Sequence, residues 1–97
     1  MSLTRRGDPD AFLPLEQLAE RCGLSADLVR RLVRLGLIDA ADEEGELFAL
    51  ETTVRVQRIA RLHGDLGVNY AGAGVVLQLL EQIEVLEARL RRLQDDE

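Results

Sequence analysis

Lysine and tryptophan are absent from this chain of 97 residues, and cysteine and histidine occur only once each. Because Cys22 has no second cysteine to pair with, an internal disulfide is excluded. His63 stands without other ligands at metal-binding spacing, so neither a metal nor another cofactor is predicted. No apolar run reaches the roughly 18 residues needed to cross a bilayer, and the polar N-terminal residues are unlike a secretory leader. We therefore expect a cytoplasmic protein.

Positive charge is also scarce. The chain carries 12 basic residues, all of them arginine, against 18 acidic residues, which gives a net charge of −6. The overall charge of such a protein does not attract nucleic acid or acidic lipid. The sequence also contains no phosphate-binding loop and no nucleophile beside a general base. These absences predict a protein that is not an enzyme.

The first half of the sequence has the pattern of two short helices joined by a tight turn. A helix is predicted from Pro14, with its apolar side chains three and four residues apart. Gly23 tolerates the left-handed conformation in which helices end. Ser25 then suits the N-cap of a second helix, which ends at Gly36. The pattern predicts a helix-turn-helix unit.

An acidic segment, Ile38 to Glu51, follows the second helix. Leu37–Ile38 and Leu47–Phe48 have the character of short strands, with Gly45 in the turn between them. The sequence therefore predicts a two-stranded hairpin, or wing. The wing has no arginine, and it carries six carboxylates: Asp39, Asp42, Glu43, Glu44, Glu46 and Glu51.

Two longer helices are predicted after the wing. The third opens at Glu51 and ends at Gly67, and the fourth runs from Tyr70 to Leu93 with Asn69 as its N-cap. Apolar residues recur along the fourth helix at alternating spacings of three and four, which is a heptad seam. The seam consists of Val76, Leu79, Ile83, Leu86, Leu90 and Leu93. The broad first half of the stripe favours packing within the chain, whereas the narrow second half favours a homodimer through Ile83, Leu86, Leu90 and Leu93.

Acidic residues precede basic residues along the same helix. An antiparallel partner would set Glu81–Glu87 beside Arg89–Arg92 of the other chain, whereas a parallel partner would align like charges. The helix dipole favours the same order of charges. We predict an antiparallel pair.

These elements predict a mostly α-helical fold in three segments. Residues 1–13 form a flexible lead, residues 14–66 form a winged helix-turn-helix module with a third helix, and residues 67–97 form the C-terminal dimerisation segment.

Two stretches resemble known families. Residues 15–38, L-E-Q-L-A-E-R-C-G-L-S-A-D-L-V-R-R-L-V-R-L-G-L-I, resemble the start of the MerR-type winged helix-turn-helix group. Residues 56–83, V-Q-R-I-A-R-L-H-G-D-L-G-V-N-Y-A-G-A-G-V-V-L-Q-L-L-E-Q-I, resemble the CbpM family of chaperone modulators. The matching positions are Val56, Gln57, Arg58, Arg61, Leu62, Leu66, Tyr70 and Gly72. Many relatives have Trp and Pro where this chain has Tyr70 and Ala71.

The CbpM resemblance implies a non-enzymatic adaptor. Such proteins bind the J domain of a DnaJ/CbpA-like co-chaperone and modulate its action on Hsp70. A J domain presents a basic helix, which an acidic wing could pair with. The candidate partner-binding residues are Asp39, Asp42, Glu43, Glu44 and Glu46, with Phe48 as a candidate anchor; the alternative for Phe48 is a place in the core.

The alternative function is DNA binding by a MerR-like transcriptional regulator. Arg30, Arg31 and Arg34 lie on the helix that would enter the major groove. Three further arginines at positions 55, 58 and 61 could contact phosphates. The acidic wing and the net charge oppose this function, because affinity for DNA depends on cations placed on phosphates.

Overall fold

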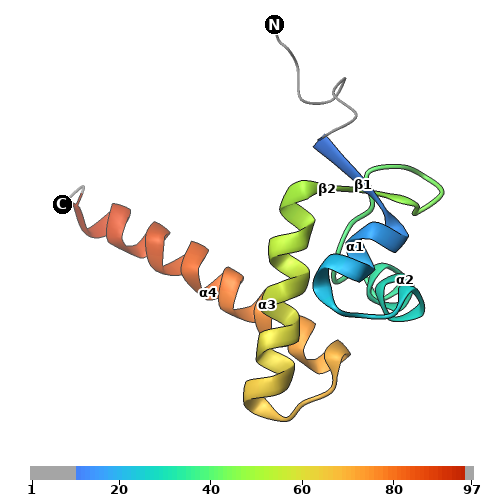
Figure 1. Ribbon diagram of the computed structural model, residues 1–97. Helices are drawn as coiled ribbons and strands as arrows, with labels where there is room; N and C mark the ends of the chain where they lie inside the picture. Colours follow the sequence, from blue (N-terminus) through green and yellow to red (C-terminus); the bar gives the residue numbers. More distant parts are fainter. Residues whose placement is uncertain (1–10, 96–97) are drawn as a thin grey trace, which may run out of the picture.

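The structure, a computed structural model that describes residues 11–95, contains four helices and one small sheet in that range (Figure 1). The predicted fold class is confirmed: a mostly helical winged helix-turn-helix with a long C-terminal helix. In chain order the elements are β1 (Phe12–Pro14), α1 (Leu15–Cys22), α2 (Ala26–Arg34), β2 (Leu47–Ala49), α3 (Leu50–Leu66) and α4 (Tyr70–Asp95).

The helix-turn-helix unit forms where the sequence placed it. Gly23 ends α1 in the left-handed conformation, with a φ of 71°, and Leu24 N–H donates to the Ala19 carbonyl to close the turn. Ser25 caps α2, because its Oγ accepts a hydrogen bond of 3.1 Å from Leu28 N–H. Both expected boundaries are therefore confirmed.

The sheet differs from the predicted hairpin. Its strands are β1 and β2, which pair antiparallel with Leu13 opposite Phe48. The strand expected at Leu37–Ile38 does not form, because Leu37 N–H donates to the Leu32 carbonyl and Gly36 N–H to the Val33 carbonyl to terminate α2. Strand β1 begins inside the stretch that was expected to be a flexible lead; residues 1–10 of that lead lie outside the described residues.

The core lies where α1 packs on α2 and α3, and where the first part of α4 packs on α2 and α3. Among residues 11–95 it contains thirteen buried apolar side chains. They are Leu13, Leu15, Leu18, Ala19, Val29, Leu32, Leu37, Ile38, Phe48, Val56, Ile59, Ala73 and Leu77. Cys22 of α1 is half-buried, with its Sγ 3.9 Å from the Thr53 carbonyl oxygen of α3, and burial raises the pKa of this thiol.

A short corner turns the chain from α3 into α4. Gly67 ends α3 with a φ of 71°, and Asn69 Oδ1 accepts a 2.7 Å hydrogen bond from Gly72 N–H to cap α4. His63 Nδ1 lies 2.6 Å from the Val68 carbonyl oxygen, and its ring stacks on Tyr70 with the centroids 3.9 Å apart. Ring stacking therefore links the last turn of α3 to the first residue of α4.

Helix α4 approaches the end of α2 very closely at Gly74. A Cβ placed on Gly74 would lie 2.5 Å from Leu37 Cδ1 and 3.0 Å from Leu37 Cγ. Nearby, Gln78 Nε2 donates to the Gly36 carbonyl at 3.1 Å, and Arg55 Nε of α3 donates to the Leu37 carbonyl at 2.8 Å. The turn after α2 therefore contacts both long helices.

Beyond its crossing with α3, α4 extends away from the rest of the chain (Figure 1). An ion pair between Arg55 of α3 and Glu81 of α4, with the charged atoms 2.5 Å apart, lies near this crossing. No residue of α4 after Leu77 belongs to the core of the described chain. The second half of the helix consequently has its apolar seam in solvent.

We predict that Gly74→Ala destabilises the protein. The added methyl group would overlap Leu37, which is only 4% exposed and has little room to move, at a cost of about 1–3 kcal/mol. Gly64→Ala is the matched control, since Gly64 lies inside α3 with open space at its Cβ, and it should stabilise the chain by up to about 1 kcal/mol. Thermal and urea unfolding measure the change in the free energy of unfolding of both variants. A Gly74→Ala variant more stable than the wild-type chain would show that Gly74 does not lie this close to the Leu37 side chain.

Candidate functional site

The acidic loop, defined here as residues 39–46, lies between α2 and β2 and is organised around Asp42. Asp42 Oδ1 accepts hydrogen bonds of 2.9 Å from the backbone N–H groups of both Glu46 and Leu47. Gly45 N–H donates to the Asp42 carbonyl at 3.3 Å, and Gly45 adopts a φ of 75°. Ala41 N–H closes the loop on the Leu47 carbonyl at 2.7 Å. The loop is thus a closed turn fixed to the start of β2.

The charge on Asp42 is favoured by these contacts. Its pKa is lowered from the ordinary value of 3.8, first by the hydrogen bond from Leu47 N–H and also by that from Glu46 N–H. A carboxylate that accepts backbone N–H groups is more stable in its charged form. Asp42 therefore has a structural role in addition to its charge, which the sequence analysis missed. The signal was present, because Asp at the first and Gly at the fourth position are typical of a type I turn.

The other loop carboxylates project into solvent. Asp39, Glu43, Glu44 and Glu46 are exposed, and none of them forms an ion pair with an arginine in residues 11–95. Four of the five acidic residues predicted to bind a partner are therefore free to meet cations. The fifth, Asp42, holds the loop that presents them.

Phe48, the candidate anchor, lies in the core instead. Its side chain is 0% exposed, and it sits in β2 opposite Leu13. Placement on the inner face of a strand explains this burial, since neighbours along a strand point to opposite faces and Leu47 is exposed. The core alternative for Phe48 is thus correct, and we do not propose it as a partner contact.

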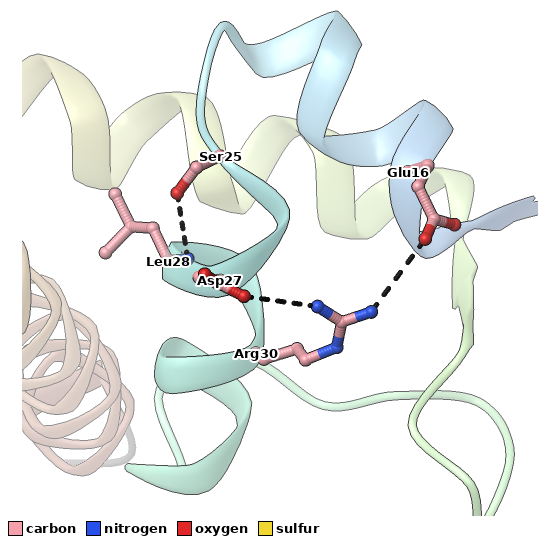
Figure 2. A network of polar contacts seen from close by, with 5 residues as sticks. All are labelled: Glu16, Ser25, Asp27, Leu28 and Arg30. Carbon is pink, nitrogen blue, oxygen red and sulfur yellow. Dashed lines mark hydrogen bonds and ion pairs between the residues drawn. The ribbon is translucent and has the colours of Figure 1, made fainter.

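The arginines of α2 occupy different environments. Arg30 is held by two carboxylates, with its guanidinium 3.8 Å from Glu16 and 3.4 Å from Asp27 (Figure 2). Arg31 and Arg34 are exposed. Arg30 and Arg34 line a small hollow of about 170 Å³ together with Glu44 and Glu46 of the acidic loop. The face of α2 that would enter a DNA groove therefore combines arginine with carboxylate.

The arginines of α3 do not form a continuous stripe either. Arg55 is half-buried and is used internally, by the Leu37 carbonyl and Glu81. Arg58 and Arg61 are exposed and line a separate hollow against α4. Sequence spacing placed the three on one face, but tertiary contacts give them different roles.

The predicted dimerisation residues lie together on the free part of α4. Ile83 is 50% exposed and Leu93 is 66% exposed, with Leu86 and Leu90 between these values. An exposed run of large apolar side chains is typical of interaction surfaces. A shallow groove of about 650 Å³, lined by Leu86 of the seam and by Val85, lies between Arg55 and Arg89.

Residues 11–95 bring together no group of three or more His, Cys, Asp or Glu side chains that could hold a metal ion. Within the same range, no helix combines the length and the apolar character needed to cross a membrane.

Comparison with known proteins identifies the family to which this architecture belongs. The model of a family described as MerR HTH family regulatory protein matches residues 13–95, which includes every described helix and strand except the first residue of β1. The chain belongs to this MerR helix-turn-helix family. Both its turn-linked helices and its long C-terminal helix lie within the matched region.

Three curated relatives carry the name chaperone modulatory protein CbpM. Those of Pseudomonas putida strains W619 and GB-1 are 26% identical to this MerR-family chain, and that of Pseudomonas entomophila strain L48 is 27% identical. Each match spans 78 residues, which is 78% of this chain and 77% of the relative. The predicted resemblance to CbpM-type, MerR-like proteins is therefore confirmed.

We predict that Asp42→Ala loosens the acidic loop at neutral pH, whereas Glu43→Ala, at an exposed neighbour, does not. The measurement is the hydrogen-exchange protection of the Glu46 and Leu47 amides, which should fall in Asp42→Ala and stay unchanged in Glu43→Ala.

The same contact predicts a pH dependence. Because the pKa of Asp42 is lowered in the folded chain, its contribution is present above the ordinary value of 3.8 and is lost as the pH falls through the lower folded value. Asp42→Asn keeps an acceptor oxygen but cannot titrate, so its loop protection should respond less to acid. Equal acid sensitivity in the wild-type chain and Asp42→Asn would contradict this origin.

Proposed function

We propose that this protein is a non-enzymatic adaptor that binds the J domain of a DnaJ/CbpA-like co-chaperone and modulates its action on Hsp70. The observation that carries the proposal is the acidic loop, which presents exposed carboxylates from a closed turn. The names of the curated relatives support a chaperone-modulating role. The CbpM resemblance supplies the J domain as the partner.

The loop acts by charge complementarity. A J domain presents a basic helix beside the loop that engages Hsp70, and Asp39, Glu43, Glu44 and Glu46 would face those cations. Complementary charges speed the encounter and set the register of a complex. The backbone hydrogen bonds to Asp42 hold the loop in shape before binding, which lowers the entropic cost of ordering it. A bound adaptor would cover the helix that Hsp70 needs.

DNA binding remains the second candidate because Arg31 and Arg34 are exposed on α2 and the family is described as regulatory. The hollow beside Arg34 opposes this candidate. A phosphate placed there would lie between the arginine and the carboxylates of Glu44 and Glu46. Repulsion from the loop would offset the attraction of the helix, since DNA affinity depends on the cations brought to the phosphates.

Reversing charge in the loop separates the two functions. Glu43→Lys with Glu44→Lys should weaken binding of an isolated J domain by about 10-fold or more, and should strengthen binding of random duplex DNA at low salt. Glu20→Lys with Asp65→Lys is the control, because it makes the same change in net charge at exposed positions away from the loop.

Isothermal titration of both variants with each ligand measures these effects. Tight DNA binding without J-domain binding by the wild-type chain would refute the adaptor. Equal effects of the two variants would show that the loop acts only through net charge.

We further propose that the protein is a homodimer paired through the second half of α4. Residues 82–95 make a helical segment of about 21 Å at 1.5 Å per residue. A helix of fewer than about 12–15 residues is marginal in water without packing, and this segment contributes nothing to the core. A second copy would cover Ile83, Leu86, Leu90 and Leu93 with the same four residues.

Charge favours the antiparallel arrangement of this pair. Glu84 and Glu87 lie before Arg89, Arg91 and Arg92 along α4, and all five are exposed. Antiparallel helices would set the acids of each copy beside the arginines of the other. Residues flanking a seam determine partner orientation in this way.

We predict that Leu86→Glu converts the dimer to a monomer, whereas Val54→Glu, at a side chain of α3 that is 58% exposed, does not. Analytical ultracentrifugation over a range of concentrations measures the mass. Orientation is tested by charge exchange: Glu84→Arg with Glu87→Arg should weaken the dimer, and adding Arg89→Glu with Arg92→Glu should restore it. A wild-type mass equal to one chain at all concentrations would overturn the homodimer.

A further inference from the structure

The hollow lined by Arg58 and Arg61 lies between α3 and α4, and none of its lining residues belongs to the acidic loop or to the heptad seam. It has a volume of about 200 Å³ and is lined by Arg58, Arg61 and Leu62 of α3 and by Leu77 and Leu80 of α4. Leu77 is 1% exposed and Leu62 is half-buried, whereas Leu80 is 43% exposed. The hollow therefore combines an apolar surface with arginines contributed by one helix.

Both arginines of this hollow lack an ion-pair partner among residues 11–95. The other arginines at helix contacts differ, because Arg30 is held by Glu16 and Asp27, and Arg55 by Glu81. Two unneutralised guanidinium groups three residues apart are notable in a chain with a net charge of −6. They make a local positive site beside exposed apolar surface.

We propose that this hollow binds an acidic amphipathic segment of another protein, in which carboxylates flank an apolar side chain. Arginine suits this ligand, because its planar fork donates two parallel hydrogen bonds to one carboxylate. An apolar side chain between the carboxylates would cover Leu80 and the accessible part of Leu62. Burial of such a side chain at the centre of charged contacts is typical of residues that dominate binding.

The surfaces of the molecule point to this occupant over a second copy of the chain. Ala73, Gly74 and Leu77 of α4 are buried, while the seam residues from Leu79 onward are exposed. A copy paired through Ile83, Leu86, Leu90 and Leu93 would use none of the residues that line the hollow. The acidic loop precedes β2, whereas Arg61 lies near the C-terminal end of α3, so the protein could hold a basic and an acidic partner together. This inference does not depend on the J-domain proposal.

The leucines also distinguish a peptide from a nucleic acid. Phosphates would engage Arg58 and Arg61 but would leave the exposed surface of Leu80 uncovered. Duplex DNA is therefore the competing occupant in the test.

The experiment uses the full chain and a fluorescein-labelled synthetic peptide in which single leucines alternate with pairs of glutamates. A peptide with glutamine in place of glutamate is the matched control ligand. Fluorescence anisotropy should show saturable binding of the glutamate peptide only. Arg58→Glu with Arg61→Glu should weaken this binding by about 10-fold or more, as expected for charged contacts at the centre of an interface. Leu80→Ser should weaken it as well.

A control variant locates the binding. Arg89→Glu with Arg92→Glu makes the same charge change beside the exposed seam and should leave the peptide affinity unchanged. Circular dichroism checks folding, and Arg58→Gln with Arg61→Gln replaces the charge reversal if that variant unfolds. The proposal is overturned if the wild-type chain does not bind the peptide, if only the Arg89 and Arg92 variant loses binding, or if unlabelled duplex DNA displaces the peptide as well as unlabelled peptide does.

Discussion

The position of both long helices depends on the close contact between the turn after α2 and Gly74 of α4. Leu37 is the centre of this contact: its N–H ends α2, its carbonyl accepts from Arg55 of α3, and its side chain lies against the bare backbone of Gly74. Gly36 adds a fourth link by accepting from Gln78. A side chain at position 74 would move α4 outward, and the hydrogen bond from Gln78 would then be lost. One short turn thus determines where α4 crosses the domain.

The same turn determines where the acidic loop begins. Ile38 is buried directly after Leu37, so the chain enters the loop from a fixed point at the core. At the far end, Asp42 accepts from Glu46 and Leu47, and Leu47 starts the strand that pairs with β1. The carboxylates are therefore carried by a segment that is anchored at both ends, although their side chains are in solvent. Anchoring of this kind lets a surface loop present a defined charge pattern to a partner.

Local signals in the sequence predicted the helices well, because each boundary depends on a nearby residue. Gly23, Ser25, Gly67 and Asn69 act within a few residues of their own position, and each does in the structure what its type predicted. Heptad spacing likewise predicted the exposed seam of α4. The pairing of the strands was not predicted, because β1 pairs with a strand more than thirty residues away. No residue near β1 in the sequence indicates which strand it will pair with. The strand expected at Leu37–Ile38 does not form because Leu37 N–H donates to the Leu32 carbonyl at the end of α2. The same N–H group is therefore not available for a hydrogen bond in the sheet.

The candidate site was harder to predict than the fold for a related reason. Charge along the sequence located the acidic loop, but only three-dimensional contacts show which charges remain available. Arg55 and Arg58 are three residues apart on one helix, yet Arg55 is used by Leu37 and Glu81 while Arg58 has no ion-pair partner in the described chain. Asp42 and Glu43 are adjacent, yet one holds the loop and the other projects from it.

Exposed carboxylates gather on the acidic loop, whereas Arg58 and Arg61 line the hollow between α3 and α4 without an ion-pair partner among residues 11–95. A helix-turn-helix that binds DNA needs its cations on α2 and the wing. In this chain the wing segment is acidic, Arg30 is held by two carboxylates, and Arg34 lines a hollow together with Glu44 and Glu46. The surface where the architecture would place DNA therefore carries carboxylates that repel phosphates.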